Sequence, residues 1–208
     1  MDGKIHAVLG AGTGVAVAQT IGMEPVDTAI LMSAGVIAGL VPDLDTAGKL
    51  ANKISLSHKM IQGFVRTVGI LAGAYAWFGL EGYAMYVGLA LGIFLLVIAP
   101  KFSQKLMLLI SGVAIIAAGV ALTEVWVWLS GIYVAAAALV GHRSYTHSIA
   151  GLLFFAVIAF YINERFALEG LFWALVLGYA SHLLADMRLV PGNKRGIKLF
   201  LPFSQKLI

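Results

Sequence analysis

The chain reads Gly141-His142-Arg143-Ser144-Tyr145-Thr146-His147-Ser148 between two apolar runs, 125–140 and 149–162. A second polar cluster, Ser181-His182-Leu183-Leu184-Ala185-Asp186, closes the last apolar run at 168–185. Histidine and aspartate are costly near hydrocarbon, and in membrane proteins they usually face the bundle interior or a water-filled cavity. The alternation of apolar runs with short polar breaks therefore predicts a helical membrane protein whose functional site lies at the breaks.

The composition is that of a polytopic membrane protein. Hydrophobic residues make up 61% of the 208 residues and charged residues 12%, against about 25% charged residues in soluble domains. Apolar runs fall at 5–22, 28–41, 61–80, 83–99, 106–123, 125–140, 149–162 and 168–185. A spanning helix needs about 20 residues, so the runs that begin at 28, 125 and 149 are short and could be partly re-entrant. We expect an all-α transmembrane bundle of about eight helices, forming a single integral membrane domain over residues 1–208.

Two features of the N-terminal apolar run can each be interpreted in two ways. Lys4 followed by apolar residues resembles a signal peptide, but His6 and the missing cleavage-site pattern favour a retained first helix. The run Gly10-Ala11-Gly12-Thr13-Gly14 suggests a nucleotide-binding loop, but no strand precedes it. Small residues at this spacing instead indicate close helix packing in lipid.

The charges separate by side when the eight helices are counted in order. One side carries nearly all the basic residues and the other the acidic residues Glu24, Asp27, Glu81, Glu124, Glu164 and Glu169. The positive-inside rule makes the basic side cytoplasmic, which predicts a multi-pass protein of the cytoplasmic (inner) membrane with both termini cytoplasmic. The net charge of +4 is then explained by contact with anionic membrane lipids, and no direct nucleic acid binding is expected. Basic, partly apolar segments near 46–60 and 188–208 suit the interface, although 46–60 equally suits a solvated loop.

Counting in the same way places seven candidate metal ligands on the cytoplasmic side, and these are His6, Asp43, Asp45, His142, His147, His182 and Asp186. The chain has no cysteine, so a metal must be held by nitrogen and oxygen ligands. His182 and Asp186 share a helix face at i and i+4. His142 and His147 are five apart, which favours a loop, with Ser148 or Thr146 as a cap for the next helix.

Each candidate has an ordinary structural alternative. Asp43 and Asp45 follow Pro42, where aspartate is also a turn former. His182 and Asp186 could simply form a hydrogen-bonded pair at a helix end, and His6 could be a buried structural residue. Arg143 could bind a phosphate or carboxylate, or anchor the loop on the positive side.

Taken together, His6, Pro42-Asp43-Leu44-Asp45, the 141–148 segment and the 181–186 segment resemble the inner-membrane-associated metal-dependent hydrolases of the YdjM type, also described as LexA-binding. The resemblance spans nearly the whole chain, including the stretch from Gly196 to Pro202. It implies an activity class and no substrate. The chain departs from the family at Leu189, where a threonine often follows the last aspartate by three residues.

Two functions fit these residues. The first is a metal-dependent hydrolase with one or two divalent ions, most simply zinc, in which Asp43 or Asp45 acts as general base and Arg143 stabilises negative charge. Its site at the headgroup level favours a lipid or headgroup phosphoester or ester as substrate. The alternative is a non-catalytic interaction or regulatory protein with a structural metal site and a cytoplasmic protein partner. A transporter is disfavoured because runs 83–99 and 106–123 have almost no polar residues.

Overall fold

The computed structural model of the chain describes residues 3–45, 49–188 and 196–208. Within these ranges the protein is helical and contains no strand, which confirms the predicted all-α class. Each of the eight predicted apolar runs corresponds to one long helix, with ends that agree within a few residues. The elements are α1 (Gly3–Ile21), α2 (Pro25–Leu40), η1 (Val41–Asp45), α3 (Lys49–Ile54), α4 (His58–Gly79), α5 (Gly82–Ile98), η2 (Ala99–Lys101), α6 (Gln104–Ala121), α7 (Val125–Leu139), η3 (Tyr145–His147), α8 (Ile149–Phe166) and α9 (Leu171–Asp186), where η marks a 3-10 helix.

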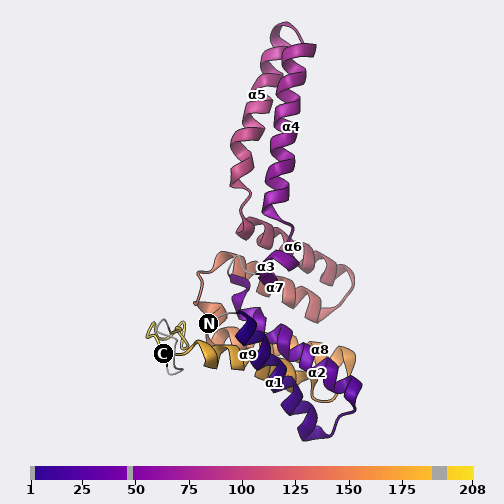
Figure 1. Cartoon of the computed structure of the whole chain (residues 1–208), viewed down its shortest axis with the longest axis vertical. Helices are drawn as coiled ribbons and strands as arrows, with labels where there is room; N and C mark the ends of the chain where they lie inside the picture. The colour runs from indigo at the N-terminus through magenta and orange to yellow at the C-terminus, as the bar shows by residue number, and fades with distance from the viewer. Residues whose placement is uncertain (1–2, 46–48, 189–195) are drawn as a thin grey trace.

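Helices α1, α2 and α9 pack at close range because glycines leave room where they cross. A side chain at Gly10 or Gly14 of α1 would overlap the backbone of α2 at Gly35 and Leu31. A Cβ atom at Gly178 of α9 would lie 2.7 Å from the carbonyl oxygen of Gly35, which a Cβ atom at Gly10 would also meet. The predicted packing role of the N-terminal glycines is therefore confirmed, and α8 completes this group in Figure 1.

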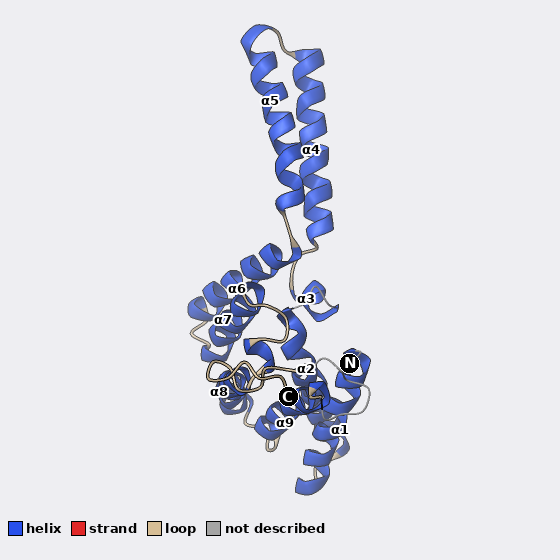
Figure 2. Ribbon diagram, turned by 90° about the vertical axis from the view of Figure 1, so that its left-hand side faces the viewer, coloured by secondary structure: helices blue, strands red, loops and turns tan. Residues whose placement is uncertain are grey.

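Helices α6 and α7 form an antiparallel pair that is also closely packed across glycines. A Cβ atom at Gly112 would lie 2.6 Å from the backbone nitrogen of Ala135, and Gly131 meets Ile116 equally closely. Figures 1 and 2 both show this pair between the α1/α2/α8/α9 group and the α4/α5 hairpin. The pair thus connects the two parts of the molecule.

The α4/α5 hairpin extends away from the other helices (Figures 1 and 2). Its two helices pack against each other across Gly69 and Gly92. Large apolar side chains are exposed along its length, including Phe78 at 86% and Tyr83 at 83%. Helices that are apolar on their outer faces are typical of segments surrounded by lipid, so we expect the hairpin to lie in the membrane.

Polar contacts fix the base of the hairpin. The His58 ring nitrogen Nδ1 lies 2.6 Å from Gln104 Oε1, and the Gln104 amide donates to the Ser55 hydroxyl. Gln62 Nε2 donates to the carbonyl of Phe102 at 2.8 Å. His58 is thus used in a local network that joins α4 to α6.

Four helical segments of the described chain are long and apolar enough to cross a membrane, namely Pro25–Asp45, Gly82–Lys101, Gln104–Ala121 and Ile149–Phe166. Two of the short predicted runs therefore gain the necessary length, because η1 extends α2 and α8 continues to Phe166. The apolar helices α7 and α9 are shorter. Of the three short runs, only the one that forms α7 is still short enough to suggest a partly re-entrant segment.

The two segments predicted to lie at the interface are described in part. Residues 49–54 form α3, while 46–48 and 189–195, including Leu189, lie outside the described residues. The end of the tail pairs with itself, since the Ile197 and Ile208 backbones exchange hydrogen bonds of 3.1 and 3.0 Å. The Ile149 amide, at the start of α8, donates to the carbonyl of Leu199 at 2.9 Å. The tail therefore packs beside the loop that precedes α8.

We predict that the turns after α1 and α4 are exposed on the same outer face of the membrane. Both turns carry an acidic residue, Glu24 or Glu81, and the positive-inside rule assigns the acidic loops to the outer side. Glu24→Cys and Glu81→Cys in this cysteine-free chain should react with an impermeant maleimide added to intact cells.

Lys53→Cys in α3 is the matched control and should react only after the cells are opened. Labelling of Lys53→Cys in intact cells, with protection of Glu81→Cys, would reverse the predicted topology.

Candidate metal centre

The seven predicted ligand residues converge at one end of the α1/α2/α9 group in three overlapping clusters. His182 belongs to the first and second of these clusters, and His147 to the second and third. They come from α1 (His6), η1 (Asp43 and Asp45), the loop after α7 (His142), η3 (His147) and α9 (His182 and Asp186). Five of the seven are at most 4% exposed; the Asp43 side chain is 27% exposed and that of His142 is 43% exposed. Residues more than a hundred positions apart in the sequence therefore lie together in one largely buried cluster.

The end of α2 aims its two aspartates in different directions. Pro42 has no N–H to continue the α-helical hydrogen bonds, and the chain tightens into the 3-10 helix η1. At three residues per turn, side chains at i and i+2 point about 120° apart. Asp43 Oδ1 accordingly lies 3.7 Å from His182 Nε2, whereas Asp45 Oδ1 lies 2.8 Å from His142 Nδ1.

The loop before α8 positions His147. Arg143 has φ of 59°, a left-handed conformation that costs a non-glycine residue roughly 1–2 kcal/mol. In this conformation its N–H donates to Asp45 Oδ2 at 3.2 Å. Ser148 then caps α8 by accepting from the Gly151 N–H at 3.3 Å, which confirms one of the two predicted caps. His147 is thus held between a fixed turn and a capped helix.

Two carboxylate oxygens lie near the facing Nε2 atoms of His147 and His182. His147 Nε2 lies 3.2 Å from His182 Nε2 and 3.5 Å from Asp43 Oδ1, and it lies 3.7 Å from Asp186 Oδ2. His182 Nε2 lies 3.7 Å from the same Asp43 oxygen and 3.9 Å from the same Asp186 oxygen. Metal–ligand bonds of about 2.0–2.1 Å in a tetrahedron imply ligand atoms about 3.3 Å apart. The donor set and its spacing therefore fit a small divalent ion.

Hydrogen bonds behind the two rings assign their protons. His182 Nδ1 donates to the carbonyl of Gly39 at 2.7 Å, so its Nε2 carries a lone pair in the neutral ring. The Thr146 hydroxyl donates to Asp45 at 2.6 Å, so its oxygen accepts from His147 Nδ1 at 3.1 Å. His147 Nε2 therefore also carries a lone pair. Two lone pairs that face each other at 3.2 Å repel unless a proton on one ring or a metal cation lies between them.

Asp45 supports the site from behind the ring of His147. Its fully buried carboxylate accepts hydrogen bonds from the Thr146 hydroxyl, the Arg143 N–H and His142 Nδ1, and its Oδ2 lies 3.4 Å from His147 Nδ1. A carboxylate that accepts from the second nitrogen of a metal-binding histidine fixes the ring orientation and raises its basicity. His142 contacts Asp45 and does not reach the four-atom group.

A second group surrounds the other oxygen of Asp186. His6 Nε2 lies 3.5 Å from Asp186 Oδ1, and the His6 ring stacks on that of His182 at 3.7 Å. His6 Nδ1 is buried without a hydrogen-bond partner among the described residues, as is Arg143 Nε. Arg143 reaches the cluster through a 3.1 Å ion pair with Asp186 Oδ2. A buried polar atom without a partner costs about 1–3 kcal/mol, which a bound ion or water at His6 would relieve.

The electrostatics also favour a cation. Among the described residues, the carboxylates of Asp43, Asp45 and Asp186 face one guanidinium, that of Arg143. Burial lowers the pKa of His147, but its hydrogen bonds with Asp43 and Asp45 raise it, and the net result is a pKa above its ordinary value. The carboxylates therefore stabilise positive charge on or beside the imidazole, and a divalent ion can supply that charge in place of a proton.

Comparison with known families agrees with this arrangement. The family model described as YdjM inner membrane protein matches residues 1–208, the whole chain. The chain belongs to the YdjM inner membrane protein family. The comparisons with curated proteins and with solved structures found no match. Membership of the YdjM family places this protein in a membrane, in agreement with its apolar helices.

Sequence reasoning missed two hydroxyl residues of this YdjM-family site. Thr146 was considered only as a helix cap, yet it bridges Asp45 and His147. The buried Tyr179 hydroxyl donates to the Thr146 carbonyl and lies 2.8 Å from the Tyr133 hydroxyl. Tyr179 precedes His182 by three residues and so shares its helix face, which is a signal that the sequence does contain.

Asp45→Asn should weaken metal binding about 10–100-fold, although the substitution changes none of the four converging ligand atoms. The asparagine amide would present N–H groups to donors that now point at a carboxylate. Metal affinity is measured by competition with a chromogenic chelator. Asp27→Asn, in the first turn of α2, is the matched control. An Asp45→Asn affinity equal to that of wild type would rule out the supporting role.

Proposed function

We propose that this protein is a metal-dependent hydrolase of the cytoplasmic membrane that acts on a lipid or headgroup phosphoester or ester. The observation that carries the proposal is the convergence of two imidazole nitrogens and two carboxylate oxygens beside an arginine whose side chain is 16% exposed. Structural zinc sites usually close all four positions with protein ligands, whereas a catalytic site keeps one open. The 27% exposure of the Asp43 side chain supports access to the cluster from outside.

His147, His182 and Asp186 would hold the proposed ion, with Asp43 beside it and one position left open for water. Nitrogen and oxygen donors without cysteine suit zinc or another first-row divalent ion. A second ion would be held by His6 and Asp186. When bound, the metal would lower the pKa of a coordinated water toward about 7 and so would supply hydroxide at cytoplasmic pH.

The other residues have roles that follow from their contacts. Arg143, held by Asp186 at 3.1 Å, stabilises negative charge that develops on a phosphoryl or acyl oxygen. Asp43 is the more exposed of the two aspartates and is the better candidate to accept a proton from the attacking water. Asp45 and Thr146 keep the His147 ring in its metal-binding tautomer.

The substrate class is inferred from the level of the site. The cluster lies at helix ends, on the side to which the charge pattern assigns the cytoplasmic headgroups. A site in that position meets ester and phosphoester bonds of membrane lipids directly. A cytoplasmic protein partner could regulate this activity through α3 and the tail.

Purified protein, with any affinity tag removed, should contain about one or two divalent ions per chain, because the cluster supplies ligands for either number. His147→Ala and His182→Ala should each reduce the metal content at least tenfold. Elemental mass spectrometry gives the readout. His58→Ala is the matched control, since its ring bonds to Gln104 and should leave the content unchanged. Full metal content in both His147→Ala and His182→Ala would disprove the assignment.

Asp43→Asn should retain most of the metal and lose about 100-fold or more in turnover, the usual contribution of a positioned base. The amide fills the same space as the carboxylate but cannot accept the proton. Turnover is measured on a panel of phospholipids, lysolipids and nitrophenyl phosphoesters, with Asp27→Asn as control. If the metal-loaded wild type cleaves nothing and Asp43→Asn only lowers the thermal midpoint, the structural-metal and regulatory alternative replaces the catalytic one.

A further inference from the structure

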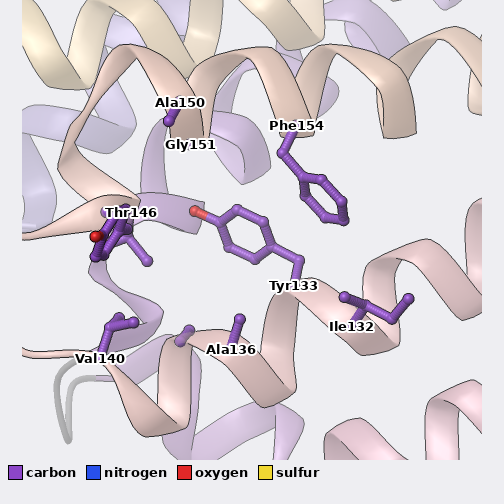
Figure 3. Close-up of a pocket in the computed structure, with 10 residues that line it drawn as sticks. Ile132, Tyr133, Ala136, Val140, Thr146, Ala150, Gly151 and Phe154 are labelled. Atoms are coloured by element: carbon purple, nitrogen blue, oxygen red, sulfur yellow. The ribbon is translucent and has the colours of Figure 1, made fainter. Parts of the chain in front are cut away.

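A pocket of about 190 Å³ lies between α7 and α8, next to the metal centre. Figure 3 shows Tyr133 and Ala136 of α7 on one side, and Ala150 and Phe154 of α8 on the other. Its lining runs from Val140 to Ile132 along α7, about 12 Å at 1.5 Å per residue. Ligand pockets usually measure about 300–1,000 Å³, so this one suits part of a lipid.

The pocket offers an apolar ligand no competing polar groups. Its lining is aliphatic and aromatic apart from the hydroxyls and backbone of Tyr133, Tyr145 and Thr146. The Tyr133 hydroxyl is engaged by Tyr179 at 2.8 Å, and the Thr146 hydroxyl by Asp45 at 2.6 Å. An unbranched hydrocarbon chain can therefore fill the space without leaving these two hydroxyls unpaired, and Tyr145 is 48% exposed.

The pocket and the metal centre share a wall. Thr146 lines the pocket, and its hydroxyl also contacts Asp45 and the ring of His147. Figure 3 shows the Tyr133 hydroxyl pointing toward Thr146, at the end of the pocket nearest the metal centre. A ligand that fills the pocket therefore ends within one residue of a proposed metal ligand.

The side chains around the pocket face the surroundings of the helices and are apolar. Leu139 is 72% exposed and Leu153 is 62% exposed, while Ile132, in the lining itself, is 38% exposed. α8 is long and apolar enough to span the membrane and α7 is a shorter apolar helix, so we expect these exposed positions to lie against lipid. Entry from the hydrocarbon layer thus requires no passage through water.

We propose that the pocket between α7 and α8 holds one acyl chain of a membrane lipid whose headgroup bond lies at the metal centre. The inference rests on the proposed hydrolase and narrows its substrate to a (phospho)ester that carries a long acyl chain. A soluble phosphoester would occupy the metal centre and leave the pocket empty.

The test is photo-crosslinking of purified full-length protein with phosphatidylethanolamine that carries a diazirine in one acyl chain. In wild type, crosslinked peptides should map to the segments around Tyr133 and Phe154. Ala136→Phe projects a ring into the pocket from an exposed position and should reduce this yield at least fivefold. Leu139→Phe, on the lipid-facing side of the same helix, is the matched control and should stay within twofold of wild type.

Ala150→Leu fills the pocket from the opposite wall and provides a second test if Ala136→Phe misfolds. Metal content and gel-filtration profile report the folding of every variant. Equal crosslinking in wild type and a folded filling variant, or crosslinks confined to α4 and α5, would overturn the acyl-chain site. Excess unlabelled phosphatidylethanolamine should compete with the probe, and equal competition by detergent would identify an unspecific apolar groove and also overturn it.

Hydrolysis distinguishes the two proposals. Both filling variants should raise KM for long-chain lipid at least fivefold and leave turnover of a soluble nitrophenyl phosphoester unchanged. If crosslinking depends on the acyl chain but no hydrolysis occurs, the hydrolase proposal is rejected and the lipid site is retained. Hydrolysis of lipid with unaltered KM in both variants would reject the pocket and keep the hydrolase.

Discussion

The facing Nε2 atoms of His147 and His182, 3.2 Å apart, are the constraint on which the site depends. Each ring is fixed from behind, His182 by the carbonyl of Gly39 and His147 by Thr146 with Asp45. Neither ring can turn its lone pair away without breaking a buried hydrogen bond. The protein therefore holds two donors in a repulsive arrangement that a cation between them converts into an attractive one.

Helix packing makes this arrangement possible. Gly39 near the end of α2 lets α1 approach, since a Cβ atom there would lie 2.8 Å from the His6 carbonyl oxygen, and its own carbonyl holds His182 of α9. One small residue thus joins three helices at the level of the cluster. Larger side chains at Gly14 or Gly178 would separate the same helices farther along, and the ligands at their ends would move apart with them.

The sequence predicted the helices and the members of the cluster well, because both depend on local patterns of apolarity and on where ionisable residues interrupt them. The sequence could not show which members of the cluster point toward the proposed metal position and which lie behind it. Asp43 and Asp45 look equivalent until the 3-10 turn after Pro42 points one toward His182 and the other toward His142. The left-handed Arg143 and the direction of the α4/α5 hairpin depend on tertiary contacts that no run of residues encodes.

The length of α7 explains why a polar centre and an apolar pocket adjoin. Its 15 residues span about 22 Å, less than the roughly 30 Å of a bilayer core. If its outer end is held at the interface by Trp126, its inner end stops below the headgroups, and the chain must return through residues 140–148 within reach of hydrocarbon. Polar backbone at that depth needs protein partners. Asp45 and Tyr179 provide them for Arg143 and Thr146, and in doing so they place the metal-binding face of His147 where headgroup and acyl chain meet.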